Sequence, residues 1–226
     1  MFSDFSVARD FDTNRDGILE ASKATCLLFV QSTDAKGHSD WEFATAFFVA
    51  PNLLLTAGHN ALNPKDAVKT DRWLFSPGTP HLDMDQIASH SPWAIRCTVV
   101  ENMFKSGEIS KDIAVLSSEN FEVESYLKIS TDPVPVDAII DVVGYPGEKK
   151  RKWLREKHPK LESLVTSETA GEMLLPTGKL VVTRGVVTER RPDVTSYTIS
   201  TCPGFSGSCV IYNGKVHGMV TLLLSD

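Results

Sequence analysis

Three short stretches of the sequence carry side chains that can act together in catalysis. The stretch TAGH ends at His59, KDIAVL contains Asp112, and PGFSGS contains Ser206. A serine hydroxyl is too weakly acidic to attack an amide unaided, so an imidazole must take its proton. A buried carboxylate must in turn hold that imidazole in the correct tautomer. The three residues together supply a nucleophile, a base and an orienting carboxylate, which is the set that acyl transfer needs.

Each motif taken alone has a simpler explanation. A Gly-x-Ser-Gly sequence is usually a turn, an Asp before an apolar strand is usually a cap, and a His after Ala-Gly is usually a loop residue. The combination of the three motifs is more specific than any one of them. His59, Asp112 and Ser206 follow one another at separations of 53 and 94 residues, each next to an apolar run. The order His, Asp, Ser is the one found in two-barrel serine proteases, whereas hydrolases of other folds use other orders.

The chain resembles the trypsin-like (chymotrypsin-fold) serine proteases from about Thr25 to its end. Residues 44–59, ATAFFVAPNLLLTAGH, resemble the strand pair of that family that ends in the catalytic His. Residues 142–147, VVGYPG, and the Ser-Gly-Ser at the nucleophile are closer to the glutamyl-endopeptidase-like branch than to the digestive enzymes. The resemblance implies a serine endopeptidase of two barrels that acts on a polypeptide substrate in the crevice between them.

The elements that must position these groups are short strands. Runs of β-branched and aromatic residues alternate with Gly, Pro and Asn clusters, which is typical of barrels rather than of βαβ units. The expected fold is therefore all-β, with two six-stranded antiparallel β-barrels in the chymotrypsin-like double-barrel arrangement. The expected strands are Thr25–Val30, Phe43–Val49, Leu53–Thr56, Trp73–Phe75, Ile95–Val100, Ile113–Leu116, Ala138–Gly144, Leu180–Val187, Ser196–Ser200, Ser208–Ile211 and Val216–Leu224.

The chain is expected to divide into three parts. Residues 1–23 form an N-terminal extension with an acidic loop, residues 24–125 a first barrel with the His and the Asp, and residues 126–226 a second barrel with the nucleophile. Only two residues follow the last strand-like run, so the second barrel is expected to lack its last strand. A truncated chain remains the alternative.

The resemblance also implies a role for each residue of the site. His59 acts as general base toward Ser206 and then as general acid toward the leaving amine, while Asp112 accepts a hydrogen bond from the other imidazole nitrogen. The backbone amides of Gly204 and Ser206 form the oxyanion hole, which needs a conformation at Gly204 that a side chain would resist. The scheme requires no cofactor.

Phe205 departs from the family pattern. Digestive proteases carry at this place an Asp that binds a freshly cut N-terminus, and the closer branch often carries Asn. A phenyl ring cannot form that ion pair. The oxyanion loop must therefore be held in another way.

The specificity pocket is expected from two segments near the nucleophile. A protease for basic residues needs a buried acid in the pocket floor, and Ser200 is not one. Leu223 stands where a Gly would leave the pocket open, and Val220 stands where glutamyl-specific relatives carry a His. We therefore expect a small or apolar side chain before the scissile bond. The candidate substrate-binding residues are Ser200, Thr201, Cys202, Val220, Thr221, Leu222 and Leu223.

An acidic segment near the N-terminus resembles the first half of an EF-hand calcium loop. Asp12, Asn14 and Asp16 would supply oxygen ligands. However, Lys23 stands where the bidentate Glu is expected, and we expect the chain to enter a strand next rather than a helix. Acidic turns without a metal are common, so calcium is only a weak candidate here, and no other metal site is predicted.

A basic segment follows the expected strand Ala138–Gly144. Lys149–Lys160 holds seven Lys or Arg residues around Trp153 and Leu154. The simplest interpretation is a solvated amphipathic helix in a loop of the second barrel. The more specific interpretation is a binding site for an acidic partner, or a lid over the cleft.

Composition and charge narrow the partners. The net charge of −6 argues against nucleic acid as the main partner, and no apolar run has the length of a membrane span. The polar N-terminus lacks the features of a secretory signal, which favours a cytoplasmic over a secreted location unless a signal has been removed. Four cysteines allow three disulfide pairings, but free buried thiols are expected. They are Cys26, Cys97, Cys202 and Cys209.

Two further functional interpretations remain open. The departures at Phe205 and Leu223 and the short C-terminus are compatible with a catalytically impaired protease-like binding or regulatory module. The acidic loop is compatible with a calcium-regulated peptidase. Labelling of the nucleophilic serine by a fluorophosphonate separates the active protease from the impaired one.

Overall fold

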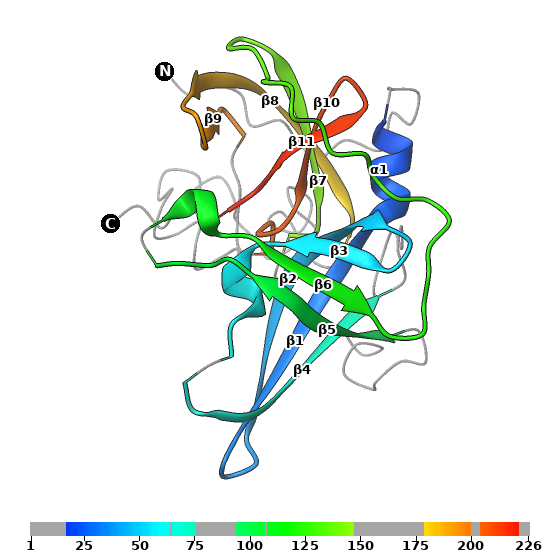
Figure 1. Ribbon diagram of the computed structural model, residues 1–226, viewed down its shortest axis with the longest axis vertical. Coiled ribbons are helices and arrows are strands. Elements are labelled where there is room, and N and C mark those ends of the chain that lie inside the picture. The colour runs from blue at the N-terminus through cyan, green and yellow to red at the C-terminus, as the bar shows by residue number, and fades with distance from the viewer. Residues whose placement is uncertain are drawn as a thin grey trace, which may run out of the picture.

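The computed structural model describes residues 17–63, 65–75, 94–106, 108–146, 179–199 and 204–221, and the protein is mostly β-structure in these ranges (Figure 1). The helical elements are short. They are α1 (Ile18–Ala24) and the 3₁₀ turns η1 (Gly58–Ala61) and η2 (Ile109–Lys111). No helix among the described residues is long and apolar enough to cross a membrane.

The first half of the protein is a closed barrel of six antiparallel strands in the order β1-β2-β3-β6-β5-β4. Alternate residues of β6 are buried, because successive side chains of a strand point to opposite faces. Large apolar side chains such as Phe47, Leu54, Leu74 and Leu116 fill the barrel. The strands are β1 (Thr25–Asp34), β2 (Ser39–Ala50), β3 (Leu53–Thr56), β4 (Ala67–Phe75), β5 (Ala94–Asn102) and β6 (Ala114–Ser118).

The second half is a curled half-barrel rather than a closed one. Its five described strands form an antiparallel sheet in the order β11-β10-β7-β8-β9, and the two outer strands are not paired with each other within the described residues. Ile140, Val142, Val187 and Phe205 lie in its separate apolar core. The strands are β7 (Ile139–Gly144), β8 (Val181–Arg190), β9 (Thr195–Tyr197), β10 (Cys209–Tyr212) and β11 (Lys215–Met219).

The all-β prediction and the double-barrel architecture are confirmed, with one correction. The second half is a curled half-barrel of five described strands where a barrel of six strands was expected. The expected lack of a last strand stays a prediction, because residues 222–226 lie outside the described residues. The expected strand Val216–Leu224 ends early as β11 at Met219, and Leu222 to Leu224 lie outside the described residues. The predicted strand at Ser196–Ser200 is the shorter β9, which pairs with β8 alone.

Helix α1 corrects a second expectation, since the chain does not enter a strand directly after residue 17. Ile18, Ala21 and Ala24 recur at helical spacing and are buried. Ser22 donates its hydroxyl hydrogen to the carbonyl of Ile18 at 2.8 Å. Seven residues are too few for a helical period to stand out from the strand that follows. Helix α1 packs against β2, β7 and β10, so it contacts both halves (Figure 1).

Candidate active site

His59 lies on the 3₁₀ turn η1, directly after β3. A Cβ atom on Gly58 would come within 2.7 Å of the Cβ of Phe104, so only glycine fits before His59. The turn is held from both sides. Asn102 Nδ2 donates to the Gly58 carbonyl at 3.2 Å, and Arg72 Nη2 donates to the Ala61 carbonyl at 2.6 Å.

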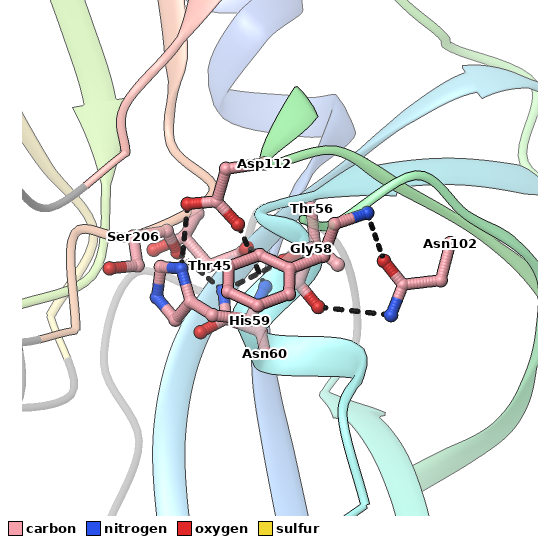
Figure 2. Close-up of polar contacts among 9 residues, drawn as sticks. Thr45, Thr56, Gly58, His59, Asn60, Asn102, Asp112 and Ser206 are labelled. Carbon is pink, nitrogen blue, oxygen red and sulfur yellow. Dashed lines mark hydrogen bonds and ion pairs between the residues drawn. The ribbon is translucent and has the colours of Figure 1, made fainter. Parts of the chain in front are cut away.

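Asp112 lies between η2 and β6 and meets His59 because β3 pairs with β6. The register places Thr56 opposite Ala114, so the chain after β3 and the chain before β6 leave the barrel at the same edge. Asp112 Oδ2 lies 2.8 Å from His59 Nδ1, and Asp112 Oδ1 accepts a hydrogen bond from the His59 backbone amide at 2.8 Å (Figure 2). One carboxylate therefore fixes both the ring and the backbone of His59.

The electrostatics favour an ionised Asp112. Burial raises the pKa of its carboxyl, but the side-chain and backbone hydrogen bonds from His59 outweigh burial and hold the pKa below its usual value. An ionised carboxylate only accepts hydrogen bonds, so His59 Nδ1 carries the proton in this contact. The other ring nitrogen, Nε2, is then left with the lone pair that a general base needs.

Ser206 lies next to this pair, in the loop of the second half that precedes β10. Asn60 Nδ2 donates to the Ser206 carbonyl at 3.2 Å, and Figure 2 draws the Ser206 side chain beside the imidazole of His59. The Ser206 hydroxyl is buried and has no hydrogen-bond partner among the described residues. The structure thus brings the three predicted residues together, with the Ser206 hydroxyl not engaged in a hydrogen bond.

The loop around Ser206 has two glycines in the left-handed region. Gly204 has φ +96° and Gly207 has φ +88°, conformations that L side chains rarely adopt. A Cβ atom on Gly207 would also lie 2.0 Å from the Thr45 carbonyl oxygen. No described residue accepts a hydrogen bond from the amide of Gly204 or of Ser206. These are the two amides predicted to form the oxyanion hole.

Several hydrogen-bonding residues of the site were not predicted from the sequence. Thr45 and Asn60 link the loop of Ser206 to the first barrel, and Thr56 binds the Thr45 carbonyl within that barrel. Asn102 supports the turn that holds His59. Asn60 directly follows His59, and this place in the sequence could have indicated it. Thr45 has no such signal, because a Thr in an apolar strand is usual.

The predicted specificity residues are only partly within the described chain. Val220 is buried in the second core, and its carbonyl accepts the Gly207 amide at 2.8 Å. Thr221 lines a cavity of about 490 Å³ together with Ile109, Val187 and Ile199. The predicted residues Ser200, Thr201, Cys202, Leu222 and Leu223 lie outside the described residues.

The calcium and partner candidates also lie outside the described residues. These are Asp12, Asn14 and Asp16 in the acidic loop and the basic segment Lys149–Lys160. Within the described ranges, no group of three His, Cys, Asp or Glu side chains is placed to hold a metal ion.

The comparison with protein families decides the identity of the chain. The sequence model of the family described as Trypsin matches residues 21–225. The chain belongs to the trypsin family. This trypsin-family protein is a serine-type peptidase, and its substrate is a polypeptide. A comparison with curated proteins finds no match.

Solved structures similar to this trypsin-family protein include other proteases. A Glu endopeptidase in complex with MPD has a TM-score of 0.55 and 20% identity, covering 84% of this chain and 76% of that chain. The active form of the Rv3671c protease from M. tuberculosis has a TM-score of 0.53 and 18% identity, and the match covers 97% of this chain and 81% of that chain. The inactive form of the Rv3671c protease has a TM-score of 0.51 and 16% identity, and the match covers 89% of this chain and 78% of that chain. At these identities the likeness shows a shared fold.

Proposed function

We propose that this protease hydrolyses peptide bonds through His59, Asp112 and Ser206, with an acyl-enzyme intermediate on Ser206. The observation that carries the proposal is the pair of 2.8 Å contacts between Asp112 and His59. They orient the imidazole and put the proton on Nδ1, so Nε2 is free to accept a proton from the neighbouring serine.

In the acylation step, the Ser206 oxygen forms a bond to the carbonyl carbon of the substrate as His59 Nε2 takes the hydroxyl proton. The carbonyl π electrons move onto the substrate oxygen, which becomes an oxyanion. When the tetrahedral intermediate collapses, the C–N bond breaks and His59 gives its proton to the leaving amine. Asp112 stabilises the imidazolium that exists between these two transfers.

The oxyanion needs hydrogen-bond donors that are already in place. The amides of Gly204 and Ser206 are proposed as these donors, and neither donates to a described residue. Removal of one such donor typically costs on the order of 3 kcal/mol of transition-state stabilisation. Water then attacks the acyl-enzyme by the reverse sequence of proton transfers. The chain's own groups carry every proton, so the scheme calls for no metal or organic cofactor.

For specificity we propose a small or apolar side chain before the scissile bond. The expected pocket residues that are described, Val220 and Thr221, are uncharged. The cavity that Thr221 lines also contains the apolar side chains of Ile109, Val187 and Ile199. Val220 and Thr221 give no counter-ion for a Lys, Arg or Glu side chain, so a charged substrate residue would be desolvated at them without compensation. Asp193 and His217 also line the cavity.

Labelling with a fluorophosphonate probe tests the proposal, because the probe reacts only with an activated serine. The wild-type protein is expected to be labelled and to cleave casein, and Ser206→Ala is expected to lose both properties. The matched control is Ser208→Ala. The Ser208 hydroxyl is buried and has no hydrogen-bond partner among the described residues, so its removal breaks no described hydrogen bond. A folded wild-type protein without labelling at Ser206 would instead support the impaired binding module.

A further inference from the structure

The segment Gly204–Ser206 needs an external support. Gly204 has no Cβ and lies at φ +96°. A glycine backbone has more conformational freedom than that of other residues, so Gly204 does little to hold its own conformation. Phe205 is fully buried in the second core and carries no charge, so an ion pair cannot hold the loop through this residue. Contacts from the first barrel must therefore supply part of the restraint.

Thr45 of β2 makes such contacts at both ends of the segment. Its hydroxyl donates to the Gly204 carbonyl at 2.8 Å, and its backbone amide donates to the Ser206 carbonyl at 2.9 Å. Thr45 is fully buried, so water does not compete for these bonds. Two hydrogen bonds from one residue of the first barrel thus hold both ends of a three-residue loop in the second half.

The direction of the hydroxyl proton of Thr45 is determined by a third contact. The backbone amide of Tyr145 donates to Thr45 Oγ1 at 3.0 Å. A hydroxyl has one proton, and the amide already occupies a lone pair of the oxygen. The O–H bond is therefore directed at the Gly204 carbonyl, and a threonine is better suited here than a residue that only accepts.

The backbone of Thr45 is itself fixed by residues around His59. Thr56 donates its hydroxyl hydrogen to the Thr45 carbonyl at 2.8 Å, and Asn60 Nδ2 donates to Thr56 Oγ1 at 3.0 Å (Figure 2). Thr56 ends β3, and Asn60 follows His59. One hydrogen-bonded network therefore joins the proposed general base to the proposed oxyanion loop.

We propose that Thr45 is a positioning residue for the oxyanion hole, acting through the carbonyl of Gly204. This inference rests on the proposed function, because it assigns Thr45 to the same reaction. If the peptide that joins Gly204 to Phe205 rotates, the backbone torsion angles of Gly204 change with it. The amide of Gly204, which is a proposed oxyanion donor, is then turned away from its position. Without the hydroxyl of Thr45, the Gly204 carbonyl and the Tyr145 amide each lose a described partner.

The test compares rates of fluorophosphonate labelling, since the phosphoryl oxygen of the probe needs the same donors as the oxyanion of a substrate. Thr45→Val keeps the shape of the side chain and removes the hydroxyl. We expect its maximal labelling rate to fall roughly 10- to 100-fold, below the 10²–10³-fold effect of losing a donor entirely. The concentration of probe at half-maximal rate is expected to change little, because binding of the probe before reaction does not depend on the hole.

Two further variants isolate the hydroxyl. Thr45→Ser keeps it and is expected to label within about threefold of wild type, while Thr45→Ala differs from Thr45→Ser only by that hydroxyl and is expected to label as slowly as Thr45→Val. The Ser-to-Ala ratio measures the hydroxyl even if valine prevents folding, which circular dichroism reports. Thr183→Val is the matched control, since Thr183 is buried on β8 and its hydroxyl has no partner among the described residues.

The outcomes separate this inference from the proposed function. Wild-type labelling with equal rates for Thr45→Ser and Thr45→Ala would overturn the role of Thr45 and leave the proposed function intact. Rates for Thr183→Val as low as those for Thr45→Val would also overturn it. A folded wild-type protein that is not labelled at Ser206 would contradict the proposed function itself.

Discussion

At the scale of single residues, Asp112 determines which nitrogen of His59 carries the proton. Its two oxygens have different partners, the ring Nδ1 and the backbone amide of His59. An Asn side chain at position 112 would keep one oxygen as a hydrogen-bond acceptor but would carry an NH₂ group in place of the other oxygen. If that NH₂ group faced Nδ1, the ring proton would move to Nε2, and the imidazole would lose its ability to act as a base toward Ser206.

Asp112→Asn is therefore expected to lower kcat for peptide hydrolysis by on the order of 10⁴-fold, with the fold retained. The rate is measured with a chromogenic peptide substrate, and circular dichroism checks the fold. Asp137→Asn is the matched control: Asp137 is exposed and has φ +65°, a conformation that Asn tolerates well. Retention of more than a tenth of wild-type activity in Asp112→Asn would contradict the proposed role.

At the scale of elements, the chain at both ends of α1 contacts the second half of the protein. Gly17 precedes α1 at φ +83°, and a Cβ atom there would lie 2.4 Å from the Cα of Gly214, in the turn between β10 and β11. At the other end, Thr25 Oγ1 lies 3.7 Å from Cys209 Sγ, at the start of β10. The helix thus packs against the strand that follows Ser206.

Gly17→Ala is expected to lower the free energy of unfolding by more than Gly37→Ala does. Both glycines have φ +83°, so each Ala variant has a similar backbone strain of about 1–2 kcal/mol. Only Gly17 has backbone atoms within contact of the added methyl group, since nothing lies within 4 Å of a Cβ at Gly37. Urea unfolding measures both variants against wild type. Equal losses would show that α1 does not need its close contact with the β10–β11 turn.

At the scale of the whole molecule, the thiols of the described residues are buried and free. They are Cys26, Cys97 and Cys209. Burial, opposed by the charge of Arg72 and aided by that of Glu119, raises the pKa of Cys97 to about 12. Folding thus keeps this thiol neutral at a pH where the unfolded chain ionises it. The contribution of the neutral Cys97 thiol to the free energy of unfolding is fully present below the ordinary pKa of a thiol. It is lost as the pH rises toward 12.

Cys97→Val tests this linkage, because it removes the ionisable group from a buried position and keeps an apolar side chain there. Between pH 8 and pH 10.5, the free energy of unfolding of wild type is expected to fall by about 2 kcal/mol more than that of the variant. Urea unfolding at both pH values gives the two differences. The other buried thiols remain in both proteins, and burial, rather than Cys97, is the main cause of the raised pKa of Cys26. Parallel losses in the two proteins would show that Cys97 ionises normally in the folded state.

Local patterns in the sequence predicted most of the strands. Leu53–Thr56 was predicted with its observed bounds, because a short run of β-branched and aliphatic residues between turn residues is typical of a buried strand. Trp73–Phe75 covers only the end of β4, because Ala67–Arg72 carries charged side chains that conceal the alternation. Helix α1 was not predicted, because its seven residues are too few for a helical period to stand out in the sequence. The roles proposed for His59, Asp112 and Ser206 stay predictions until the labelling experiment.

The amino-acid sequence by itself determined the residue types, their order and the runs that become strands, because these depend on neighbours in the chain. Tertiary structure alone decided that the hydroxyl of Thr45 meets the Gly204 carbonyl and that Phe205 enters a core. Such contacts join residues that are 159 positions apart, and only the packing of the two halves selects them. A hydroxyl in an apolar strand has no sequence pattern that names its partner.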